Sequence, residues 1–315
     1  MAQRKGKILL SMTGFSPDRW RELLSERREV VLEPHGPRDP SIDYAVVWKQ
    51  RPKLLAGLPN LKAIFSVGAG VDHILLDAHV PEVPIVRVVA ANLTQRMVEY
   101  VLWRVLDHHR QGMLYRDQQS RKVWFEPPQP GAGSVSVGVM GMGELGRAAA
   151  GLLSASGFRV NGWSRTKKDL AGIAGFHGED GLQPFLGATD ILVVLLPLTP
   201  QTRGIIDHSL LRELRRANAL GGAVLINAGR GLLQKDDDIL RALEDGTLKE
   251  ASLDVFESEP LPATSPLWNH PRVFVTPHAA ASSNPEHLVA PMLEQMDAFE
   301  RGEPLRHVVD RRAGY

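Results

Sequence analysis

The stretch Val137-Gly138-Val139-Met140-Gly141-Met142-Gly143-Glu144-Leu145-Gly146 places the pattern G-x-G-x-x-G directly after an apolar run, and a helical pattern over residues 147–153 follows it. A strand, a glycine turn and a helix in this order are the setting in which the pattern binds a dinucleotide. Gly141 permits the tight turn, Gly143 lets the backbone approach a pyrophosphate, and Gly146 permits close packing of helix on strand. The helix N-terminus would offer free N–H groups to the phosphates. The alternative is a glycine-rich turn that binds no ligand.

The end of the next predicted strand indicates which dinucleotide is preferred. NAD-binding domains usually carry Asp or Glu at this point to hold the ribose 2′-hydroxyl. Here Ser164 stands in its place, and Arg165, Lys167 and Lys168 follow. Arg binds a phosphate through two parallel hydrogen bonds, whereas a carboxylate would repel it. We therefore expect NADP(H) to be preferred and NAD(H) to be possible, with a solvated basic loop as the alternative.

Strand and helix patterns alternate on both sides of the glycine turn. After residue 131, six strands are predicted, at residues 135–140, 158–163, 190–195, 223–227, 251–256 and 272–276, with helices at 145–155, 209–217 and 237–244. Before residue 92, strands are predicted at residues 7–10, 44–48, 62–67 and 85–89, with helices at 17–25 and 52–58. Such alternation is typical of parallel α/β sheets.

The middle and the end of the chain indicate how these two blocks are organised. Residues 94–121 carry one long helical pattern without Pro, and the Pro- and Gly-rich segment 125–131 breaks it. The last block, residues 285–315, is too small to fold alone, so we expect it to pack on the first block. The predicted fold is α/β, with two Rossmann-like doubly wound parallel-sheet domains, the first discontinuous. They cover residues 1–95 with 285–315, and residues 96–284.

Composition excludes several classes of protein. The chain has 315 residues, 37 Lys and Arg against 36 Asp and Glu, and no Cys. At roughly 150 residues per domain, two domains are expected. A nucleic-acid-binding protein would usually show a basic excess, and without Cys there is neither a disulfide nor a thiolate metal site. The longest apolar stretch, residues 191–198, is far shorter than the roughly 20 residues that span a bilayer. We expect a cytoplasmic enzyme that binds no metal, membrane or nucleic acid.

Polar residues follow three late strands of the predicted dinucleotide-binding domain. Arg230 lies between two Gly after one strand, Glu257 and Glu259 follow the next, and His278 follows the last. Ligands of open α/β sheets bind at the carboxyl ends of the strands, so these side chains should reach the edge where the dinucleotide binds. Reduction of a 2-keto acid needs such a set: a cation for the carboxylate, and a His beside a carboxylate as proton donor. Singly, each residue has an ordinary structural explanation.

The combined motifs resemble the D-isomer-specific 2-hydroxyacid dehydrogenase family over essentially the whole chain. They are the glycine turn, Asn227-Ala228-Gly229-Arg230-Gly231, Leu253-Asp254-Val255-Phe256-x-x-Glu259-Pro260 and Thr276-Pro277-His278. Within that family the chain most resembles the glyoxylate/hydroxypyruvate reductase A branch, through Ser66-Val67-Gly68-Ala69-Gly70-Val71-Asp72-His73, Trp163-Ser164-Arg165, Leu196-Pro197-Leu198-Thr199-Pro200-x-Thr202 and Val309-Asp310-Arg311-Arg312-Ala313-Gly314-Tyr315.

The resemblance implies a role for each candidate residue. His278 would be the acid/base, Glu259 rather than Glu257 its carboxylate partner, and Arg230 the substrate clamp. The implied cofactor-binding residues are Gly141, Met142, Gly143, Glu144, Leu145, Gly146, Ser164, Arg165, Thr166, Lys167, Leu196, Pro197, Thr202, Ala228, Gly229, Arg230, Asp254 and His278. The implied substrate-binding residues are Trp48, Gly68, Ala69, Gly70, Arg230 and His278, although Trp48 alone is as readily a core residue. Residues 94–121 would form an interdomain helix that also builds a homodimer.

The expected activity is NADPH-dependent reduction of small 2-keto acids, glyoxylate to glycolate and hydroxypyruvate to D-glycerate. Two alternatives remain open. One is a dehydrogenase of another small acid on the same fold, of the formate or phosphite type. The other is a binding protein that senses a dinucleotide without catalysis, against which the intact set Arg230, Glu259 and His278 argues.

Overall fold

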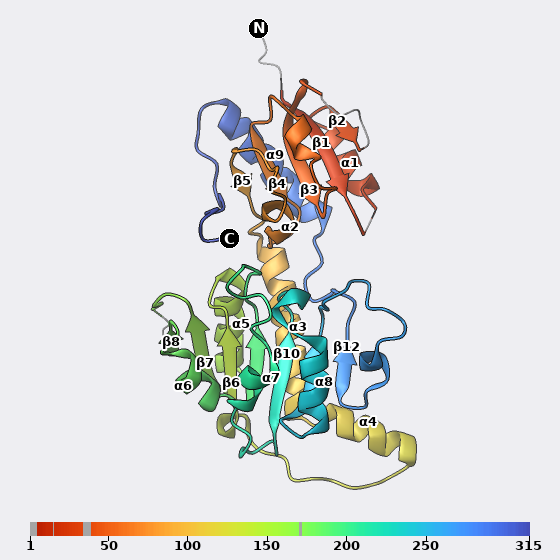
Figure 1. The fold of residues 1–315 in the computed structure, drawn as a ribbon, viewed down its shortest axis with the longest axis vertical. Helices are drawn as coiled ribbons and strands as arrows, with labels where there is room; N and C mark the ends of the chain where they lie inside the picture. The colour runs from red at the N-terminus through yellow and green to blue at the C-terminus, as the bar shows by residue number, and fades with distance from the viewer. Residues whose placement is uncertain (1–4, 15, 34–38, 170–171) are drawn as a thin grey trace. The chain divides into compact units, whose positions relative to one another are not determined.

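A computed structural model describes residues 5–14, 16–33, 39–169 and 172–315 of the chain. The chain divides into two compact units, Met1–Leu93 with Ser283–Tyr315, and Thr94–Ser282. Each unit contains one parallel β-sheet with helices packed on it (Figure 1). The predicted class, α/β with two doubly wound parallel sheets, is confirmed, and both ends of the chain belong to the first unit. The predicted domain limits differ from the observed limits by two residues.

The first unit has a sheet of order β2-β1-β3-β4-β5, in which every pairing is parallel. Its strands are β1 (Lys7–Met12), β2 (Val30–Leu32), β3 (Ile42–Trp48), β4 (Ala63–Ser66) and β5 (Ile85–Val86). Four consecutive residues of β3 and all four of β4 are buried, as expected of strands covered on both faces. The short edge strand β2 was not predicted from the sequence.

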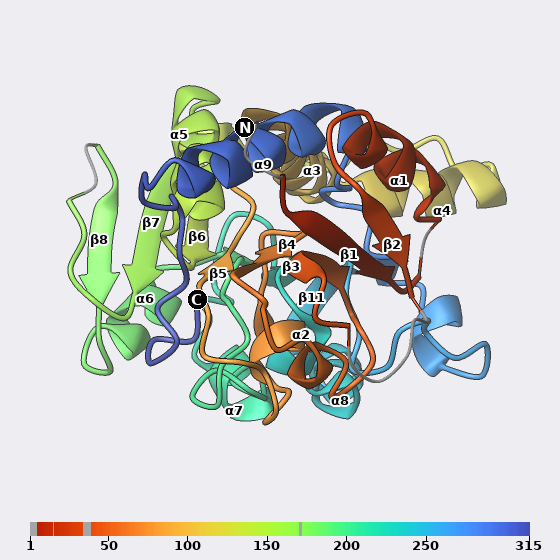
Figure 2. The ribbon, with the colours of Figure 1, turned by 90° about the horizontal axis from the view of Figure 1, so that it is seen from above.

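Helices cover this first sheet. They are α1 (Asp18–Ser25), α2 (Asp72–Leu75) and α9 (Pro285–Glu300), with the 3₁₀ turn η1 (Leu55–Gly57). The predicted helix at residues 52–58 is wrong, since only η1 forms there. The helices α1 and α9 pack side by side, as Figure 2 shows. The last helix of the chain therefore belongs to the first unit, together with strand β1.

The second unit has a seven-stranded parallel sheet of order β12-β11-β10-β9-β6-β7-β8. Its strands are β6 (Ser136–Met140), β7 (Arg159–Ser164), β8 (Ala174–His177), β9 (Ile191–Val194), β10 (Ala223–Asn227), β11 (Leu248–Leu253) and β12 (Val273–Val275). All residues of β6, β9 and β10 are buried. The chain leaves β6 toward β7 and later returns to β9 on the other side of β6. Strand order therefore reverses beside β6, at the point where open sheets bind ligands.

After the glycine turn, the described part of the second unit has four helices; the one predicted at residues 209–217 is shorter than expected, whereas those predicted at 145–155 and 237–244 each begin one residue earlier. The four helices are α5 (Glu144–Ala155), α6 (Leu182–Gly187), α7 (His208–Arg212) and α8 (Asp236–Glu244), with the 3₁₀ turns η2 (Ala132–Ser134), η3 (Gly231–Leu233) and η4 (Pro266–Asn269). Six strands were predicted here, and β8 is the seventh. Its sequence, Ala-Gly-Phe-His, is mostly exposed and lacks the apolar run that marked the others.

The predicted single helix over residues 94–121 is wrong. The structure has two helices, α3 (Ala91–His109) and α4 (Gly112–Arg121). Gln111 between them adopts a left-handed conformation with φ of 58°, which a continuous helix cannot contain. A Cβ atom at Gly112 would lie 2.0 Å from Oδ1 of Asp107, so any larger residue would displace this carboxylate from its place at the turn. The second helix extends from the body of its unit (Figure 1).

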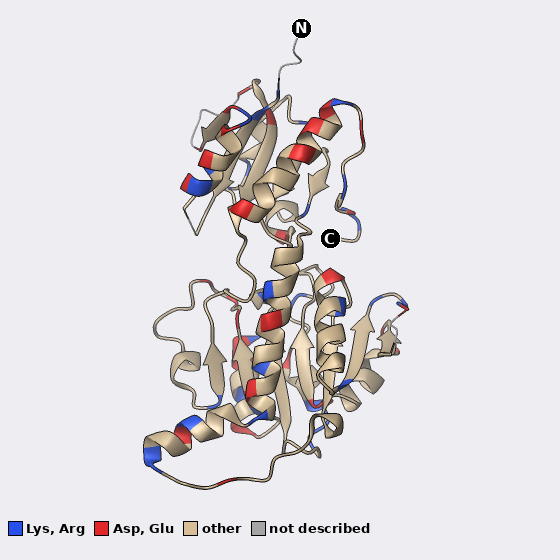
Figure 3. Cartoon of the chain, turned by 180° about the vertical axis from the view of Figure 1, so that it is seen from behind, with Lys and Arg blue, Asp and Glu red and all other residues tan. Residues whose placement is uncertain are grey.

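Charge is distributed unevenly over the helices (Figure 3). Acidic residues recur along α9, whereas α4 carries both signs. Within the described part of the chain, no helix is long and apolar enough to cross a membrane. In the same residues, no group of three or more His, Asp or Glu side chains is placed to bind a metal ion.

Candidate active site

The glycine turn after β6 has the geometry that a dinucleotide requires. Gly141 has φ of 114°, and a Cβ atom there would lie 2.7 Å from the carbonyl oxygen of Leu195. A Cβ atom at Gly146 would lie 1.8 Å from the carbonyl oxygen of Gly141, so only glycine lets α5 pack this closely on the turn. By contrast, a Cβ atom at Gly143 would meet no atom within 4 Å. The backbone at the start of α5 is therefore open to a ligand, and the residues present fit a pyrophosphate.

Two side chains of the turn face elsewhere. The Met142 side chain packs on Gly162 of β7, where an added Cβ atom would lie 2.8 Å from the methionine sulfur. Glu144 forms an ion pair with Arg147 one turn along α5. The buried Met142 would thus contact a cofactor through its backbone, whereas the Glu144 side chain stays half exposed.

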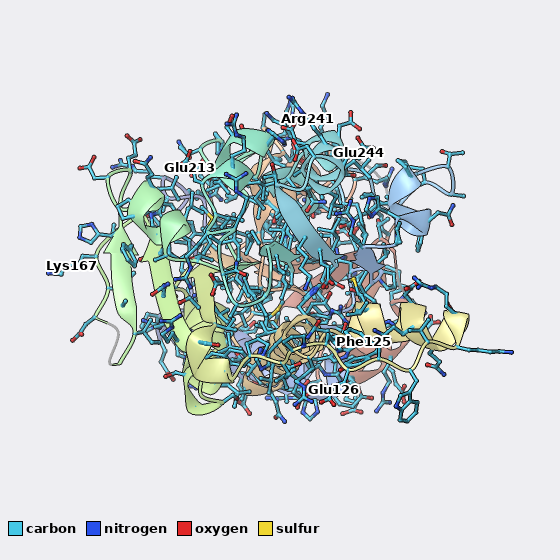
Figure 4. The ribbon with its side chains drawn as sticks, turned by 90° about the horizontal axis from the view of Figure 1, so that it is seen from below. Phe125, Glu126, Lys167, Glu213, Arg241 and Glu244 are labelled. Carbon is cyan, nitrogen blue, oxygen red and sulfur yellow. The ribbon has the colours of Figure 1, made fainter. Side chains whose placement is uncertain are left out.

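The basic loop after β7 begins with an ordered serine. Ser164 is almost fully buried, and its hydroxyl donates a hydrogen bond of 2.8 Å to the carbonyl of Thr166. Arg165, Thr166 and Lys167 are exposed. Lys167 extends outward from the edge of the sheet, as Figure 4 shows. Among these residues, no carboxylate occupies the position where one would repel a 2′-phosphate.

The segment after β9 forms a compact loop beside the glycine turn. The hydroxyl of Thr202 donates a hydrogen bond of 2.7 Å to the carbonyl of Pro197, and it accepts one of 2.8 Å from the amide of Thr199. Leu196 is buried, and its amide nitrogen lies 3.0 Å from the position of a Cβ atom on Gly141. Thr202 therefore shapes the backbone of this loop.

Asn227, the last residue of β10, orders the segment that carries Arg230. Its side-chain oxygen accepts a hydrogen bond of 3.0 Å from the amide of Gly229, and its side-chain nitrogen donates one of 2.7 Å to Gln234. A Cβ atom at Gly231 would lie 1.7 Å from the carbonyl oxygen of Phe256, so the turn after Arg230 requires glycine. The half-buried Arg230 donates to the carbonyl of Gly229 at 2.8 Å.

His278 and Glu259 form a hydrogen-bonded pair. Nδ1 of His278 lies 2.8 Å from Oε2 of Glu259, and the other carboxylate oxygen accepts a hydrogen bond from the amide of Phe256. About a third of the His278 side chain is exposed. The rival carboxylate, Glu257, is exposed and accepts a hydrogen bond of 2.7 Å from the amide of Asp236. The geometry thus pairs His278 with Glu259.

Asp254 follows β11 and is almost fully buried, with 1% of its surface exposed. Its carboxylate accepts hydrogen bonds from the Thr276 hydroxyl at 2.6 Å, the Ala279 amide at 2.8 Å and the Ala280 amide at 3.0 Å. These donors all lie in the turn that carries His278. Direct contact of Asp254 with a nicotinamide stays a prediction, and the structure adds a second role for this carboxylate in holding the turn.

The candidate substrate residues of the first unit lie around the end of β3 and the loop after β4. The ring of Trp48 is half-buried and lies 4.7 Å from the ring of His73, between centroids. A Cβ atom at Gly68 would lie 2.2 Å from the Trp48 ring, so glycine lets the indole pack on this loop. The amide of Gly68 lies 3.3 Å from the Ser66 hydroxyl, whereas no acceptor is found for the amides of Ala69 and Gly70 among the described residues.

Six strands of the second unit thus bring candidate residues to the carboxyl-terminal edge of the sheet. In spatial order they carry His278, Glu259 with Asp254, Arg230, Leu196, the glycine turn and the basic loop that begins at Ser164. Sequence reasoning did not assign roles to Asn227, Thr276, His73 or Tyr100. Asn227, Thr276 and His73 belong to motifs that were recognised, and for Asn227 and Thr276 the position directly at a strand end was the available signal. Nothing local in the sequence marked Tyr100, which contacts Thr276 across 176 residues of chain.

Comparison with known proteins shows which family the chain belongs to. The model of the family "D-isomer specific 2-hydroxyacid dehydrogenase, NAD binding domain" matches residues 102–280. A glyoxylate/hydroxypyruvate reductase A from Escherichia fergusonii is 42% identical over 286 residues, 89% of each chain. The structure of an NADPH-dependent glyoxylate/hydroxypyruvate reductase from Sinorhizobium meliloti, in complex with NADP and sulfate, is 47% identical, with a TM-score of 0.93 over 99% of this chain and 100% of that one.

A third relative is a probable 2-hydroxyacid dehydrogenase from Rhizobium etli, solved with NADP, HEPES and L(+)-tartaric acid. It is 45% identical, with a TM-score of 0.92 over 98% of this chain and 100% of that one. The family model covers more than half of the chain, and the relatives cover nearly all of it. The chain therefore belongs to the D-isomer specific 2-hydroxyacid dehydrogenase family, in its glyoxylate/hydroxypyruvate reductase A branch, and is an oxidoreductase that uses a nicotinamide dinucleotide.

Proposed function

We propose that this enzyme reduces small 2-keto acids with NADPH, glyoxylate to glycolate and hydroxypyruvate to D-glycerate. The observation that carries the proposal is the His278–Glu259 pair at the sheet edge that also holds Arg230 and the glycine turn. The relatives that are named for this reaction, and the NADP in their structures, support it. In this assignment the first unit is the substrate-binding domain, and the second unit is the dinucleotide-binding domain.

The side chains divide the chemistry between them. NADPH, when bound, supplies the hydride that goes to C2 of the keto acid. His278 donates a proton from Nε2 to the carbonyl oxygen and later regains one from solvent, so the keto acid gains one hydride and one proton. Glu259 holds Nδ1, which orients the ring and stabilises the imidazolium. Arg230 binds the substrate carboxylate and polarises the carbonyl.

In the first unit, backbone amides of the loop after β4 are the groups that we assign to the substrate carboxylate. The loop Gly68–Gly70 presents the amides of Ala69 and Gly70, and amides in such a loop attract anions. Trp48 packs on this loop and limits the volume available to a substrate side chain. We therefore assign small substrates to this enzyme.

NADPH is proposed over NADH because of the loop after β7. Arg165 and Lys167 are exposed there and are placed to bind a 2′-phosphate. NADPH or NADP accompanies several of the related structures, which supports this preference.

We also propose that two copies of the chain associate through α3, α4 and the segment after α4. Large apolar side chains are exposed there, namely Trp103, Leu106, Tyr115, Val123, Trp124 and Phe125. Trp124 is completely exposed, which is uncommon for Trp unless another surface covers it. Figure 4 shows Phe125 in the same extended segment.

Initial rates for a panel of acids test the proposed activity. Glyoxylate, hydroxypyruvate, phenylpyruvate and 2-ketoisocaproate would each be assayed with NADPH and with NADH, and formate and phosphite with NADP⁺. We expect the highest kcat/KM for glyoxylate or hydroxypyruvate with NADPH. Turnover of formate or phosphite alone would favour the alternative dehydrogenase, and NADPH binding without any turnover would favour the sensing protein.

A further inference from the structure

The turn that carries His278 has an unusual backbone. His278 has φ of 52°, in the left-handed region that residues other than glycine adopt in only about a few per cent of cases. Such a conformation is strained and persists only where surrounding contacts hold it. These contacts come mainly from Asp254, whose backbone carbonyl accepts a hydrogen bond of 2.8 Å from the His278 amide.

The Asp254 carboxylate binds the residues on both sides of His278. The hydroxyl of Thr276 lies before the histidine, and the amides of Ala279 and Ala280 lie after it. Counting the backbone contact, one buried residue receives four hydrogen bonds from this five-residue turn. The conformation of the His278 backbone is therefore tied to the orientation of one carboxylate.

Thr276 links this carboxylate to Tyr100 on α3. The Tyr100 hydroxyl lies 2.8 Å from Oγ1 of Thr276, which itself lies 2.6 Å from Oδ1 of Asp254. A hydroxyl has one hydrogen, and Thr276 gives its hydrogen to the carboxylate. Tyr100 must then donate to Thr276. Burial raises the pKa of Tyr100 well above its usual value, which keeps this donor protonated.

The position of Tyr100 is itself firmly held. Only 7% of its surface is exposed, and it lies in the apolar core that also contains Ala280. Its ring packs edge-on against Trp103, at 5.8 Å between centroids. The ring thus has packing partners of its own, so the hydroxyl can be removed while the ring stays in place.

On the basis of the proposed function, we infer that Tyr100 is a positioning residue that acts through Thr276 and Asp254 to hold the turn of His278 in its catalytic orientation. Tyr100 touches neither substrate nor cofactor in this role. Its hydroxyl fixes the direction of the Thr276 hydroxyl, and this leaves the Asp254 carboxylate aligned with the amides of Ala279 and Ala280. A histidine that must face Glu259 with one nitrogen and the substrate with the other depends on such alignment.

The test compares Tyr100→Phe, Thr276→Val and Thr276→Ser with the wild-type enzyme. Tyr100→Phe removes one hydroxyl and should lower kcat by about 3- to 10-fold, because one hydrogen bond is lost. Thr276→Val removes the donor to Asp254 and should lower kcat further, whereas Thr276→Ser keeps a hydroxyl and should restore most of it. In Tyr100→Phe, KM for the keto acid and Kd for NADPH should stay within about 2-fold, because this change leaves every residue assigned to substrate or cofactor in place.

Hydrogen exchange provides a measurement that does not depend on activity. The amides of Ala279 and Ala280 should exchange faster in Tyr100→Phe and in Thr276→Val, while exchange elsewhere in the second unit stays unchanged. The matched control is Thr189→Val, which removes another buried hydroxyl of the same unit, bonded to the carbonyl of Phe185 at 2.8 Å. This control should leave kcat and the two amides unchanged.

The double variant Tyr100→Phe/Thr276→Val decides whether the two hydroxyls act along one path. If they do, it should be no slower than Thr276→Val alone, because the second change removes a contact already broken. Wild-type kcat and wild-type amide exchange in Tyr100→Phe would overturn the inference. A wild-type enzyme that shows no turnover would overturn the proposed function. In that case, faster exchange of the Ala279 and Ala280 amides in Tyr100→Phe than in the wild type would still establish the positioning role.

Discussion

Nδ1 of His278 lies 2.8 Å from Oε2 of Glu259, although the two residues leave different strands of the sheet. The contact fixes one ring nitrogen toward the carboxylate, and in the proposed function it is the other nitrogen, Nε2, that donates to the substrate. A proton donor with a fixed ring orientation is the element that the proposed reduction needs most. Glu259 should therefore matter for the chemical step more than for binding.

Glu259→Gln should lower kcat by on the order of 10²-fold or more while Kd for NADPH stays unchanged. The amide keeps the size of the side chain but removes the negative charge that stabilises the imidazolium. Steady-state kinetics with glyoxylate and a fluorescence titration with NADPH measure the two quantities. The neighbouring Glu257→Gln is the matched control, since Glu257 contacts the amide of Asp236 instead. Equal losses in both variants would contradict the pairing.

Arg165→Ala/Lys167→Ala should raise KM for NADPH by on the order of 10- to 100-fold and change KM for NADH little. Hydrogen bonds to a charged phosphate contribute more than neutral ones, and NADH has no 2′-phosphate. Initial rates with both nucleotides measure the ratio. Arg241→Ala neutralises another exposed side chain of the same unit, on α8 (Figure 4), and should change neither KM. A similar increase for both nucleotides in the double variant would contradict phosphate binding.

The sequence patterns predicted most strands of both sheets, but they did not predict the turn between α3 and α4. Strands such as β6 and β10 are buried along their whole length and so carry an unbroken apolar run. The edge strand β8 has no such run, because most of it is exposed. The break between α3 and α4 depends on the left-handed Gln111 and on the close approach of Asp107 to Gly112. Gly112 was the only local signal.

The residues of the candidate site that directly follow a strand could be predicted from the sequence. The glycine turn, Arg230, Glu259 and His278 all stand in that position, so topology alone brought them to one edge. The contacts that position these residues could not be predicted from the sequence. Tyr100 reaches Thr276 from a helix far away in sequence, and a single tyrosine in a helical pattern resembles any core residue.

Arg28→Met should lower the stability of the first unit by about 3–5 kcal/mol, as expected when a buried ion pair loses one partner. The Arg28 side chain is fully buried and binds Asp297 and Glu300, both on α9. Arg27 also contacts Asp297 but is 40% exposed, so the control Arg27→Met should cost less than about 1 kcal/mol. Hydrogen exchange at β1 and β3 measures the first unit separately. Equal effects of the two variants would contradict the argument.

The same ion pairs predict how stability depends on pH. Burial alone would raise the pKa of both Asp297 and Glu300, but the hydrogen bonds and charge of Arg28 outweigh it, so that both pKa values are lowered. Carboxylates with a lowered pKa in the folded state contribute stability above their unfolded values of 3.8 and 4.5, and that stability is lost as pH falls through the folded values. The protection factors of the β1 amides, which correct for the intrinsic pH dependence of exchange, should therefore fall below about pH 4. In Arg28→Met this dependence should be weaker, and an unchanged dependence would contradict the assignment.

Trp124→Ser/Phe125→Ser should convert a dimer into a monomer while the fold is kept, because both side chains are more than half exposed and neither belongs to the buried core. Sedimentation velocity over a range of concentrations measures the change. Trp268→Ser, at another exposed tryptophan, should leave the dimer intact. A monomeric wild-type enzyme, or a double variant that stays dimeric, would contradict the proposed interface.

The most direct test of the central claim is a comparison of wild type and His278→Gln in the oxidation of NADPH by glyoxylate or hydroxypyruvate. Glutamine can occupy the place of the ring and contact Glu259 but cannot supply the proton. The account predicts clear turnover in the wild type, a loss of kcat on the order of 10²- to 10⁴-fold in the variant, and the same Kd for NADPH in both. Near wild-type turnover by His278→Gln would contradict it.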